Sequence, residues 1–385
     1  MVSKHRCMML VASLLLLAGC WGIEEAERMD YVHGVGVDYK EGQVHVTLQI
    51  VNLSNLGKSE TGGGESHGNQ AVLAKSKGES VNDAIFKIYN STQRRLFWGH
   101  LTFIALTEEA LKHQKFKDVI DLMDRYRETR YRILVFATQD EDVDKIFEAV
   151  AIFDGSPVYT RLTDIANTYE QSSWIKDLSM REFLLQLNEP GYDIIIPAVT
   201  TTEEDWTSIQ KTETMVKTVG VALMYKNQFR GFITGEDVNG LRWLTEDALR
   251  VNLDIDKGDK PIAEAVIIRP SFTIKPVVKG DDVTFHIHVS GTAIFNQIFE
   301  YKGYSFLKKE MEKQIEAEIK QTFHQALELD SDIYRLSEVL YRKNVRAWKK
   351  FAQDGKLPLD KDSIKISADL NIQSSRIIEE KPVIR

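Results

Sequence analysis

The sequence predicts a mixed α/β or α+β protein of more than one domain, in which mixed sheets are flanked by helices and a C-terminal domain carries two long helices on a sheet. Strand-like and helix-like segments alternate through the first half of the chain, which is typical of layered structure. Two amphipathic helix patterns and an alternating strand close the second half. The chain has 385 residues, more than one hydrophobic core usually holds, and its 43% hydrophobic and 28% charged residues are ordinary for globular proteins.

The N-terminus has the pattern of a secretory signal peptide, predicted over 1–19. Lys4 and Arg6 precede an apolar run at 8–18, which is too short to span a bilayer. The run ends in Leu-Ala-Gly followed by Cys20. A cysteine at the first mature position is typical of lipoprotein processing, so we predict acylation of Cys20. A core helix, or an ordinary secretory signal with an incidental cysteine, is the alternative.

The charge and cysteine content limit what the mature chain can do. The two cysteines are Cys7, in the leader, and Cys20, so an acylated mature chain would have no free thiol and no disulfide. Buried acyl chains contribute roughly 0.8 kcal/mol per methylene, and two or more chains hold stably. Removing the leader with its two positive charges takes the formal net charge from −8 to −10, which predicts no nucleic-acid partner. Residues 20–30 are predicted to be the lipidated tether, and the rest of the chain has no second long apolar run.

Residues 31–205 are predicted to form an N-terminal domain, which begins with a hairpin of strands 31–39 and 44–51. The second strand alternates apolar and polar residues, which predicts one buried and one wet face. The glycine-rich segment 54–70 is predicted to be a surface loop, since it lacks the Lys-Ser or Lys-Thr of a phosphate-binding loop. The other predicted strands are 71–76, 101–106, 132–138 and 192–199, the last interrupted by Pro197. The predicted helices are 80–94 capped by Ser80, a stretch capped by Thr107, and 116–126, 142–149, 162–169 and 179–187.

A polar, acidic segment at 200–214 is predicted to separate this domain from a C-terminal domain at 214–380. Its Glu203, Glu204 and Asp205 are interpreted as a solvated linker and not as a catalytic carboxylate pair. The predicted strands beyond it are 216–225, 228–233, 264–269, 272–278, 283–293 and 363–372. The predicted helices are 236–244 capped by Thr234, 305–329, which would be about 37 Å long, and 331–353. The second half of 331–353 is basic, which fits a solvated face, lipid headgroups or an acidic partner.

No catalytic, cofactor or metal constellation emerges from the sequence, so the protein is predicted not to be an enzyme. His286 and His288 share one face of a predicted strand, and His324 would be a third metal ligand only by guess; two partly exposed strand residues are the simpler interpretation. His100 fits a hydrogen-bonded structural residue better than a catalytic base. The chain has no Gly-x-Ser-x-Gly elbow, and Gly34-Val35-Gly36 lacks the last glycine of a dinucleotide loop.

Several separated segments resemble the Ger(x)C family, the C subunit of nutrient germinant receptors in endospore-forming bacteria. They run from the leader to the last helix, so the resemblance covers essentially the whole chain. One departure is Gly22, where the family often has Asp. The similar segments are Leu-Ala-Gly-Cys-Trp at 17–21, Val-Gly-Val-Asp at 35–38, Arg-Arg-Leu-Phe-Trp-Gly-His-Leu at 94–101, Gly-Val-Ala-Leu at 220–223, Gly231, Gly-Glu at 235–236, Gly-Leu-Arg-Trp-Leu at 240–244, Asp-Ile-Tyr at 332–334 and Trp-Lys at 348–349.

The resemblance implies a multidomain lipoprotein on the outer face of the spore inner membrane, beside integral-membrane A and B subunits, with no known catalytic activity. We therefore expect a lipid-anchored, non-enzymatic subunit that supports receptor assembly or signalling during spore germination. A solute-binding lipoprotein that captures a small nutrient is the alternative, and an envelope enzyme is a third possibility. Whether the chain binds germinant directly is left open by the sequence.

Overall fold

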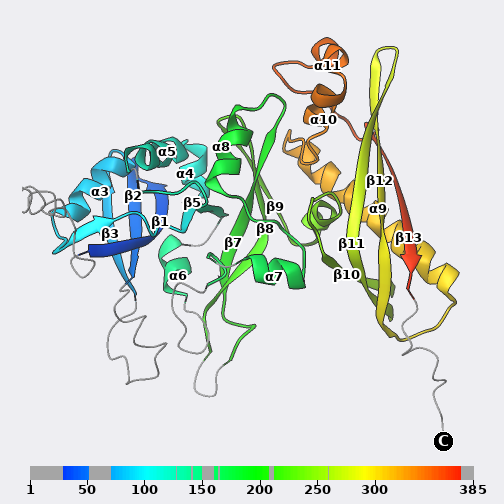
Figure 1. Cartoon of the computed structure of the whole chain (residues 1–385), viewed down its shortest axis with the longest axis horizontal. Coiled ribbons are helices and arrows are strands. Elements are labelled where there is room, and N and C mark those ends of the chain that lie inside the picture. Colours follow the sequence, from blue (N-terminus) through cyan, green and yellow to red (C-terminus); the bar gives the residue numbers. More distant parts are fainter. Residues whose placement is uncertain are drawn as a thin grey trace, which may run out of the picture.

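The computed structural model describes residues 29–51, 71–126, 128–139, 142–149, 160–163, 165–207, 212–258 and 260–373. The predicted signal peptide, Cys20 and the glycine-rich segment 54–70 lie outside these ranges. Two sheets lie side by side along the long axis of the molecule, with the N-terminal elements on the left in Figure 1 and the C-terminal elements on the right. Within the described ranges, no helix is long and apolar enough to cross a bilayer.

The first sheet has nine strands, in the order β3-β2-β1-β5-β6-β7-β8-β9, with β4 paired to β1. Strands β1, β5 and β6 are parallel neighbours, whereas β2 and β3 on one side and β8 and β9 on the other are antiparallel. The sheet is therefore mixed, as predicted. Its strands are β1 (Met29–Lys40), β2 (Gln43–Val51), β3 (Ala71–Gly78), β4 (Arg95–Phe97), β5 (Phe103–Thr107), β6 (Leu134–Thr138), β7 (Asp193–Thr202), β8 (Met215–Tyr225) and β9 (Gln228–Thr234).

Helices cover both faces of this sheet, so alternate residues of one strand enter different cores. In β5, Ile104 and Leu106 join the core under α3, α4, α5 and α8, while Phe103 and Ala105 join the core under α6. Ser80, Thr107 and Ser179 cap their helices with side-chain hydrogen bonds, the first two as predicted. The helices are α3 (Val81–Tyr89), α4 (Glu108–Lys112), α5 (Phe116–Arg125), α6 (Val143–Glu148), α7 (Ala166–Gln171) and α8 (Met180–Asn188).

Three predictions for this region need correction. Helix α3 ends at Tyr89 and not near residue 94, because the backbone turns and then extends into β4, a strand that was not predicted. Strand β7 continues through Pro197. Its pairing with β6 is limited to Ala137 and Ala198, so the N–H that a proline lacks removes little from the hydrogen bonding on that side. The polar face of β2 is largely covered and not wet, because α6 packs over it and leaves Gln49 4% exposed.

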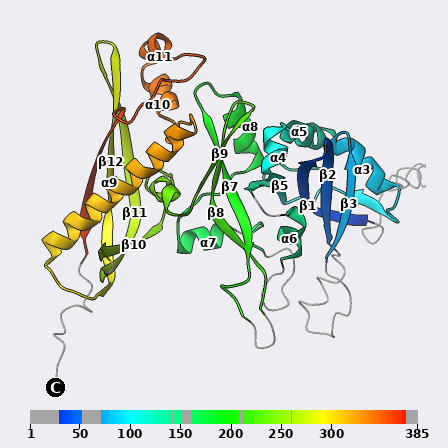
Figure 2. The ribbon, with the colours of Figure 1, turned by 180° about the vertical axis from the view of Figure 1, so that it is seen from behind.

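The second sheet is formed by β10 (Arg250–Lys257), β11 (Lys260–Lys279), β12 (Asp282–Ile298) and β13 (Ile364–Ile372), in that order. Two predicted strands, 264–269 and 272–278, form one strand, β11. Pro270 lies between them, but it falls at a register shift between Ile268 and Ser271, so the strand continues past it. Strand β10 was not predicted. The long helix α9 (Tyr304–Glu328) crosses one face of this sheet in Figure 2, and its predicted stripe from Leu307 to Phe323 is fully buried.

Two helix predictions in the C-terminal half were wrong in detail. The segment after Thr234 is a 3-10 helix, η3 (Gly235–Trp243), and the Thr234 side chain makes no capping hydrogen bond. The predicted helix 331–353 is broken into α10 (Leu336–Lys343) and α11 (Val345–Phe351). Arg335 adopts a left-handed backbone with φ 54° before α10, and Asn344 caps α11, so of the two long helices predicted here α9 alone forms as one continuous helix.

The two halves of the molecule share strand β8. Its Ala222 and Met224 enter the core of the first half, whereas Val221 and Leu223 enter the core built on the second sheet and α9. Strands β8 and β9 follow the predicted boundary at 200–214 but extend the first sheet, so this boundary does not separate the sheets. Because one strand contributes to both cores, the two halves are packed together along it.

Candidate functional site

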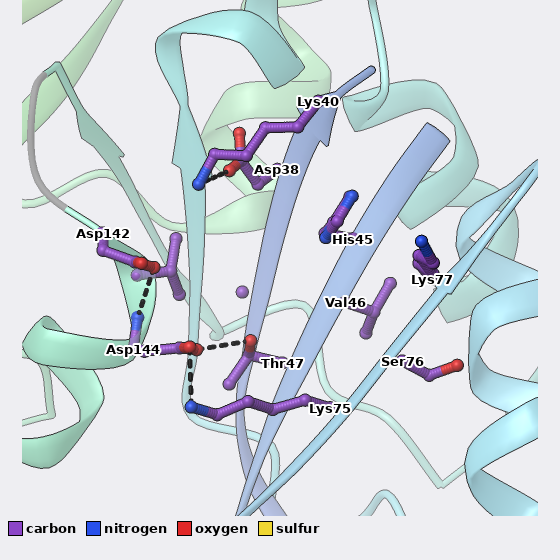
Figure 3. A pocket seen from close by; sticks show the side chains of 12 residues that line it. Asp38, Lys40, His45, Val46, Thr47, Lys75, Ser76, Lys77, Asp142 and Asp144 are labelled. Atoms are coloured by element: carbon purple, nitrogen blue, oxygen red, sulfur yellow. Dashed lines mark hydrogen bonds and ion pairs between the residues drawn. The ribbon is translucent and has the colours of Figure 1, made fainter. Parts of the chain in front are cut away.

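A polar pocket of about 290 Å³ opens between α6 and one face of β1, β2 and β3 (Figure 3). Period-two alternation places Gly36, Asp38 and Lys40 of β1 on this face. The strand register then sets Asp38 opposite His45, and His45 opposite Lys77. Side chains from three strands therefore converge on one site.

Gly36 explains why α6 can lie so close to the sheet. A Cβ at this position would lie 2.0 Å from Val143 Cγ1 and 3.2 Å from Phe147 Cζ. Only a glycine lets these α6 side chains pack directly on β1. The same packing brings Asp142 and Asp144, at the start of α6, to the edge of the pocket.

Asp38 is held as a carboxylate at the end of β1. It accepts hydrogen bonds from the Tyr39 N–H at 2.7 Å and from Thr107 Oγ1 at 2.5 Å, and it pairs with Lys40 at 2.7 Å. Burial alone would raise the pKa of Asp38, but these three partners together hold it below its usual value. Since Thr107 also caps α4, Asp38 connects the pocket to the helices on the opposite face.

Asp144 connects α6 to two strands. Its carboxylate accepts a hydrogen bond from Thr47 Oγ1 of β2 at 2.7 Å and pairs with Lys75 of β3 at 2.7 Å. The hydrogen bond to Asp144 raises the pKa of Lys75. Below this contact, Gln49 donates to the Phe147 carbonyl at 2.9 Å, so the polar residues of β2 serve to dock α6.

The pocket does not have the arrangement of a hydrolase. Its lining includes two hydroxyl groups, on Thr47 and Ser76, and one imidazole, His45. In the described part of the chain, His45 makes no hydrogen bond to either hydroxyl, whereas an activated nucleophile needs such a contact with its base. The pocket is lined mainly by charged side chains, three lysines and three aspartates, around a small polar space.

A second polar cluster is buried where β7 meets the connection between α9 and α10. Asp193 Oδ2 accepts hydrogen bonds from Ser331 Oγ at 2.6 Å and from the Asp332 N–H at 2.8 Å, and Lys356 Nζ lies 3.8 Å away. Asp332 in turn accepts the N–H groups of Leu336 and Ser337, the first of α10. Burial, reinforced by the charge of Asp193, raises the pKa of Asp332 to about 7. This cluster joins the two sheets.

The histidines considered from the sequence do not meet in a metal site. His286 and His288 are exposed on β12, as the simpler interpretation held, and His288 Nδ1 lies 3.0 Å from Ser367 Oγ. His324 lies on α9 near Lys361 and Lys320. Across the described ranges, no group of three His, Cys, Asp or Glu side chains is placed to hold a metal ion.

His100 is held by ring contacts. Its centroid lies 5.1 Å from Tyr31 and 6.0 Å from Phe97, and burial lowers its pKa. The structure shows no hydrogen bond from this ring to another described residue, so the predicted structural role rests on packing. Glu203 and Asp205 are exposed, but the segment that carries them connects the paired strands β7 and β8 of the first sheet and is not a linker between the sheets.

The basic half of the predicted last helix is partly engaged within the fold. Arg342 pairs with Glu338 at 2.7 Å, and Lys350 pairs with Asp281 at 2.7 Å. Arg346 and Lys349 are exposed. The sequence predicts neither the pocket nor the Asp193 cluster. The Val-Gly-Val-Asp segment at 35–38 and the Asp-Ile-Tyr segment at 332–334 are among the family-like segments, but their partners become visible only with the strand register.

Comparisons with known proteins match both halves of the chain. Residues 22–201 match the family described as "Spore germination protein N-terminal domain", and residues 219–376 match "Spore germination B3/ GerAC like, C-terminal". The chain is 21% identical over 361 residues to "Spore germination protein KC" of Bacillus subtilis (strain 168), covering 89% of this chain and 88% of the relative. It is 24% identical over 324 residues to "Spore germination protein B3" of the same organism, covering 80% of each. The crystal structure of the GerBC protein shares the fold, with a TM-score of 0.53 and 19% identity over 91% of this chain and 100% of that one.

Proposed function

Because the chain belongs to the GerAC family of spore germination proteins and so has a role in germination, we propose that it is a lipid-anchored, non-enzymatic subunit of a nutrient germinant receptor. The observation that carries the proposal is the match of the N-terminal and C-terminal family domains, in order, over nearly the whole chain. The subunit would support assembly or signalling of the receptor.

The proposed location of the protein is the outer face of the spore inner membrane. The support is the leader at 1–19 and the position of Cys20 directly after Leu-Ala-Gly. Acylated Cys20 would hold the folded domains at the membrane surface and raise their effective concentration near integral-membrane partners. Those partners would be the A and B subunits of the receptor.

The fold supports a scaffolding role. Strand β8 contributes side chains to both large cores, and the buried Asp193 joins β7 to the segment before α10. A subunit built in this way would present surfaces of both halves in a fixed relation to a membrane-embedded partner.

Crosslinked co-purification from the spore inner membrane tests the proposal. The wild-type chain should recover integral-membrane A and B subunits, and Cys20→Ala should lose lipid labelling and most of that recovery. The matched control is Cys7→Ser, a substitution within the leader. It should show wild-type lipid labelling and recovery, because Cys7 would be removed with the leader. Recovery of monomeric lipoprotein alone, together with normal germination in a deletion strain, would contradict the receptor role.

A further inference from the structure

We propose that the exposed basic surface of α10 and α11 binds an anionic lipid surface, as a membrane contact separate from Cys20. The proposal rests on the membrane location proposed above and adds a second attachment, in the C-terminal half of the chain. We call this surface the basic patch. It consists of five exposed cationic residues, Arg342, Lys343, Arg346, Lys349 and Lys350.

The basic patch concentrates positive charge in an acidic chain. The sequence has 57 Asp and Glu against 49 Lys and Arg, with a formal net charge of −8. Between Glu338 and Asp354, however, every charged residue is a Lys or an Arg. Because the screening length at physiological ionic strength is about 8 Å, a surface in contact with the patch interacts mainly with these cations and little with distant carboxylates. The patch can therefore attract an anionic surface although the whole chain is acidic.

Two of the five cations have partners within the fold. Arg342 pairs with Glu338 of α10, and Lys350 pairs with Asp281 in the turn before β12, each at 2.7 Å. Both pairs are open to water, since the Arg342 side chain is 70% exposed and that of Lys350 is 56% exposed. Exposed pairs of this kind are weak, so both cations can also turn towards a lipid headgroup.

Arg346 and Lys349 carry the free charge of the patch. Both are exposed on α11, and their spacing of three positions makes them neighbours on the helix surface. In the part of the chain that the structure describes, neither forms an ion pair. Val345, four positions before Lys349, is 43% exposed beside them. A phosphate headgroup can accept hydrogen bonds from the two cations while Val345 meets the apolar part of the interface.

The packing of α11 holds these charges on the outside of the molecule. Ala347 is buried, and Trp348 packs against the core built on the second sheet. Asn344 caps the helix by accepting the Ala347 N–H at 3.1 Å. Because one side of this short helix is fixed on the core, its cationic side is presented to the surroundings.

The position of α11 suits contact with an extended surface. Figures 1 and 2 place it at the upper end of the second half, beside the turn between β11 and β12, which Lys350 contacts. Strand β1, which begins nine positions after Cys20, lies in the other half. Attachment at both places would hold both halves at the membrane and set how the long axis lies along it.

Vesicle sedimentation of the full mature chain tests the proposal without an acyl anchor. The chain begins at residue 20 and carries Cys20→Ser, so that no lipid contributes to binding. The probes are vesicles of phosphatidylcholine with about 30% phosphatidylglycerol and vesicles of phosphatidylcholine alone, at about 0.1 M salt. We expect at least about tenfold stronger partitioning to the anionic vesicles. This preference should disappear at about 1 M salt, where the screening length falls to about 3 Å.

Three paired substitutions locate the binding. Arg346→Gln/Lys349→Gln removes the free cations; because each contributes roughly a factor of five near an anionic surface, partitioning should fall at least about tenfold. Arg346→Lys/Lys349→Arg keeps both charges and should bind as wild type, since attraction to headgroups requires charge and not a fixed fork geometry. Lys309→Gln/Lys313→Gln removes two exposed cations of α9, is the matched control for net charge and should also bind as wild type.

Four results would overturn the proposal: equal partitioning to both kinds of vesicle, a preference that high salt leaves unchanged, an equal loss in the α9 control, or lost binding when the two charges are exchanged. Wild-type vesicle binding by Arg346→Gln/Lys349→Gln, together with lost co-purification of membrane subunits, would assign the patch to a protein partner and overturn it as well. Because the tested chain carries no lipid, failure of this proposal is distinguishable from failure of lipid labelling or of the receptor role.

Discussion

Ser331 donates a hydrogen bond to Asp193 at the junction of the two sheets, with Oγ and Oδ2 2.6 Å apart. Asp193 begins β7 of the first sheet, whereas Ser331 lies between α9 and α10 beside the second. The exposed fractions are 0% for Asp193 and 1% for Ser331. Because the two residues are 138 positions apart in the chain, this contact reports on the packing of the two halves.

Removing the Asp193 carboxylate should loosen this junction. Asp193→Ala would leave the Ser331 hydroxyl and the Asp332 N–H buried without an acceptor, which should lower the free energy of unfolding by about 3 kcal/mol. Asp193→Asn keeps an acceptor oxygen and should lose less than half as much. Urea denaturation followed by circular dichroism measures both. Equal midpoints for Asp193→Ala and wild type would show that the contact contributes nothing to folding.

The stability of the junction should depend on pH. Burial and the nearby charge of Asp193 raise the pKa of Asp332 to about 7, from about 3.9 for a free aspartate. Between those values the folded chain keeps a proton that the unfolded chain loses, so the free energy of unfolding should fall as pH rises from about 4 to about 7 and level off above that. Asp193→Asn removes the neighbouring charge and should flatten this dependence. Urea midpoints at half-unit pH steps measure it; an identical slope in wild type and Asp193→Asn would contradict it.

Much of the fold follows from local patterns in the sequence. The stripe from Leu307 to Phe323 predicted α9 because helical period and burial coincide. The break between α10 and α11 did not follow, because it lies at Asn344, whose non-helical backbone (φ −151°, ψ 77°) and side-chain cap on α11 leave the apolar spacing unchanged. Likewise, the alternation of β2 predicted a wet face, but α6 covers it, and the coverage depends on a contact between residues about a hundred positions apart.

The sites were less predictable than the elements. Asp38 was noted as part of a family-like segment, but its partner Thr107 comes from a strand that becomes a neighbour only in the folded sheet. Asp193 carries no local signal at all, since its burial depends on Ser331 and the turn after α9. Strand register and long-range packing, which no single segment encodes, decide which polar residues meet.

Gly36 should be intolerant of a side chain. In Gly36→Ala the new Cβ would lie 2.0 Å from Val143 Cγ1, so α6 must move, and we expect a loss of about 1–3 kcal/mol in the free energy of unfolding. The double variant Gly36→Ala/Val143→Ala removes the clashing methyl groups and should lose less than the sum of the two single changes. Thermal denaturation of the four proteins measures this coupling. Strictly additive losses would show that Gly36 is not required for the docking of α6.

The Gly-Leu-Arg-Trp-Leu segment at 240–244 has a structural explanation in a contact with α9. Arg242 pairs with Glu318 through two nitrogen atoms, with the shortest distance 2.8 Å, and Trp243 Nε1 donates to Glu318 Oε2 at 2.7 Å. Both charged side chains are 13% exposed. A Cβ on Gly240 would lie 2.4 Å from the Glu318 carbonyl oxygen, so η3 and α9 approach closely at this point.

Breaking this contact from the α9 side should be costly. Glu318→Ala leaves a largely buried guanidinium and an indole N–H without their acceptor, and we expect a loss of about 3 kcal/mol in the free energy of unfolding. Arg242→Lys keeps the charge but not the two-pronged geometry, so it should lose less, though more than the exposed control Lys313→Gln. Urea denaturation ranks the three variants. If Arg242→Lys matched Lys313→Gln, the paired geometry would contribute nothing to the stability of this contact.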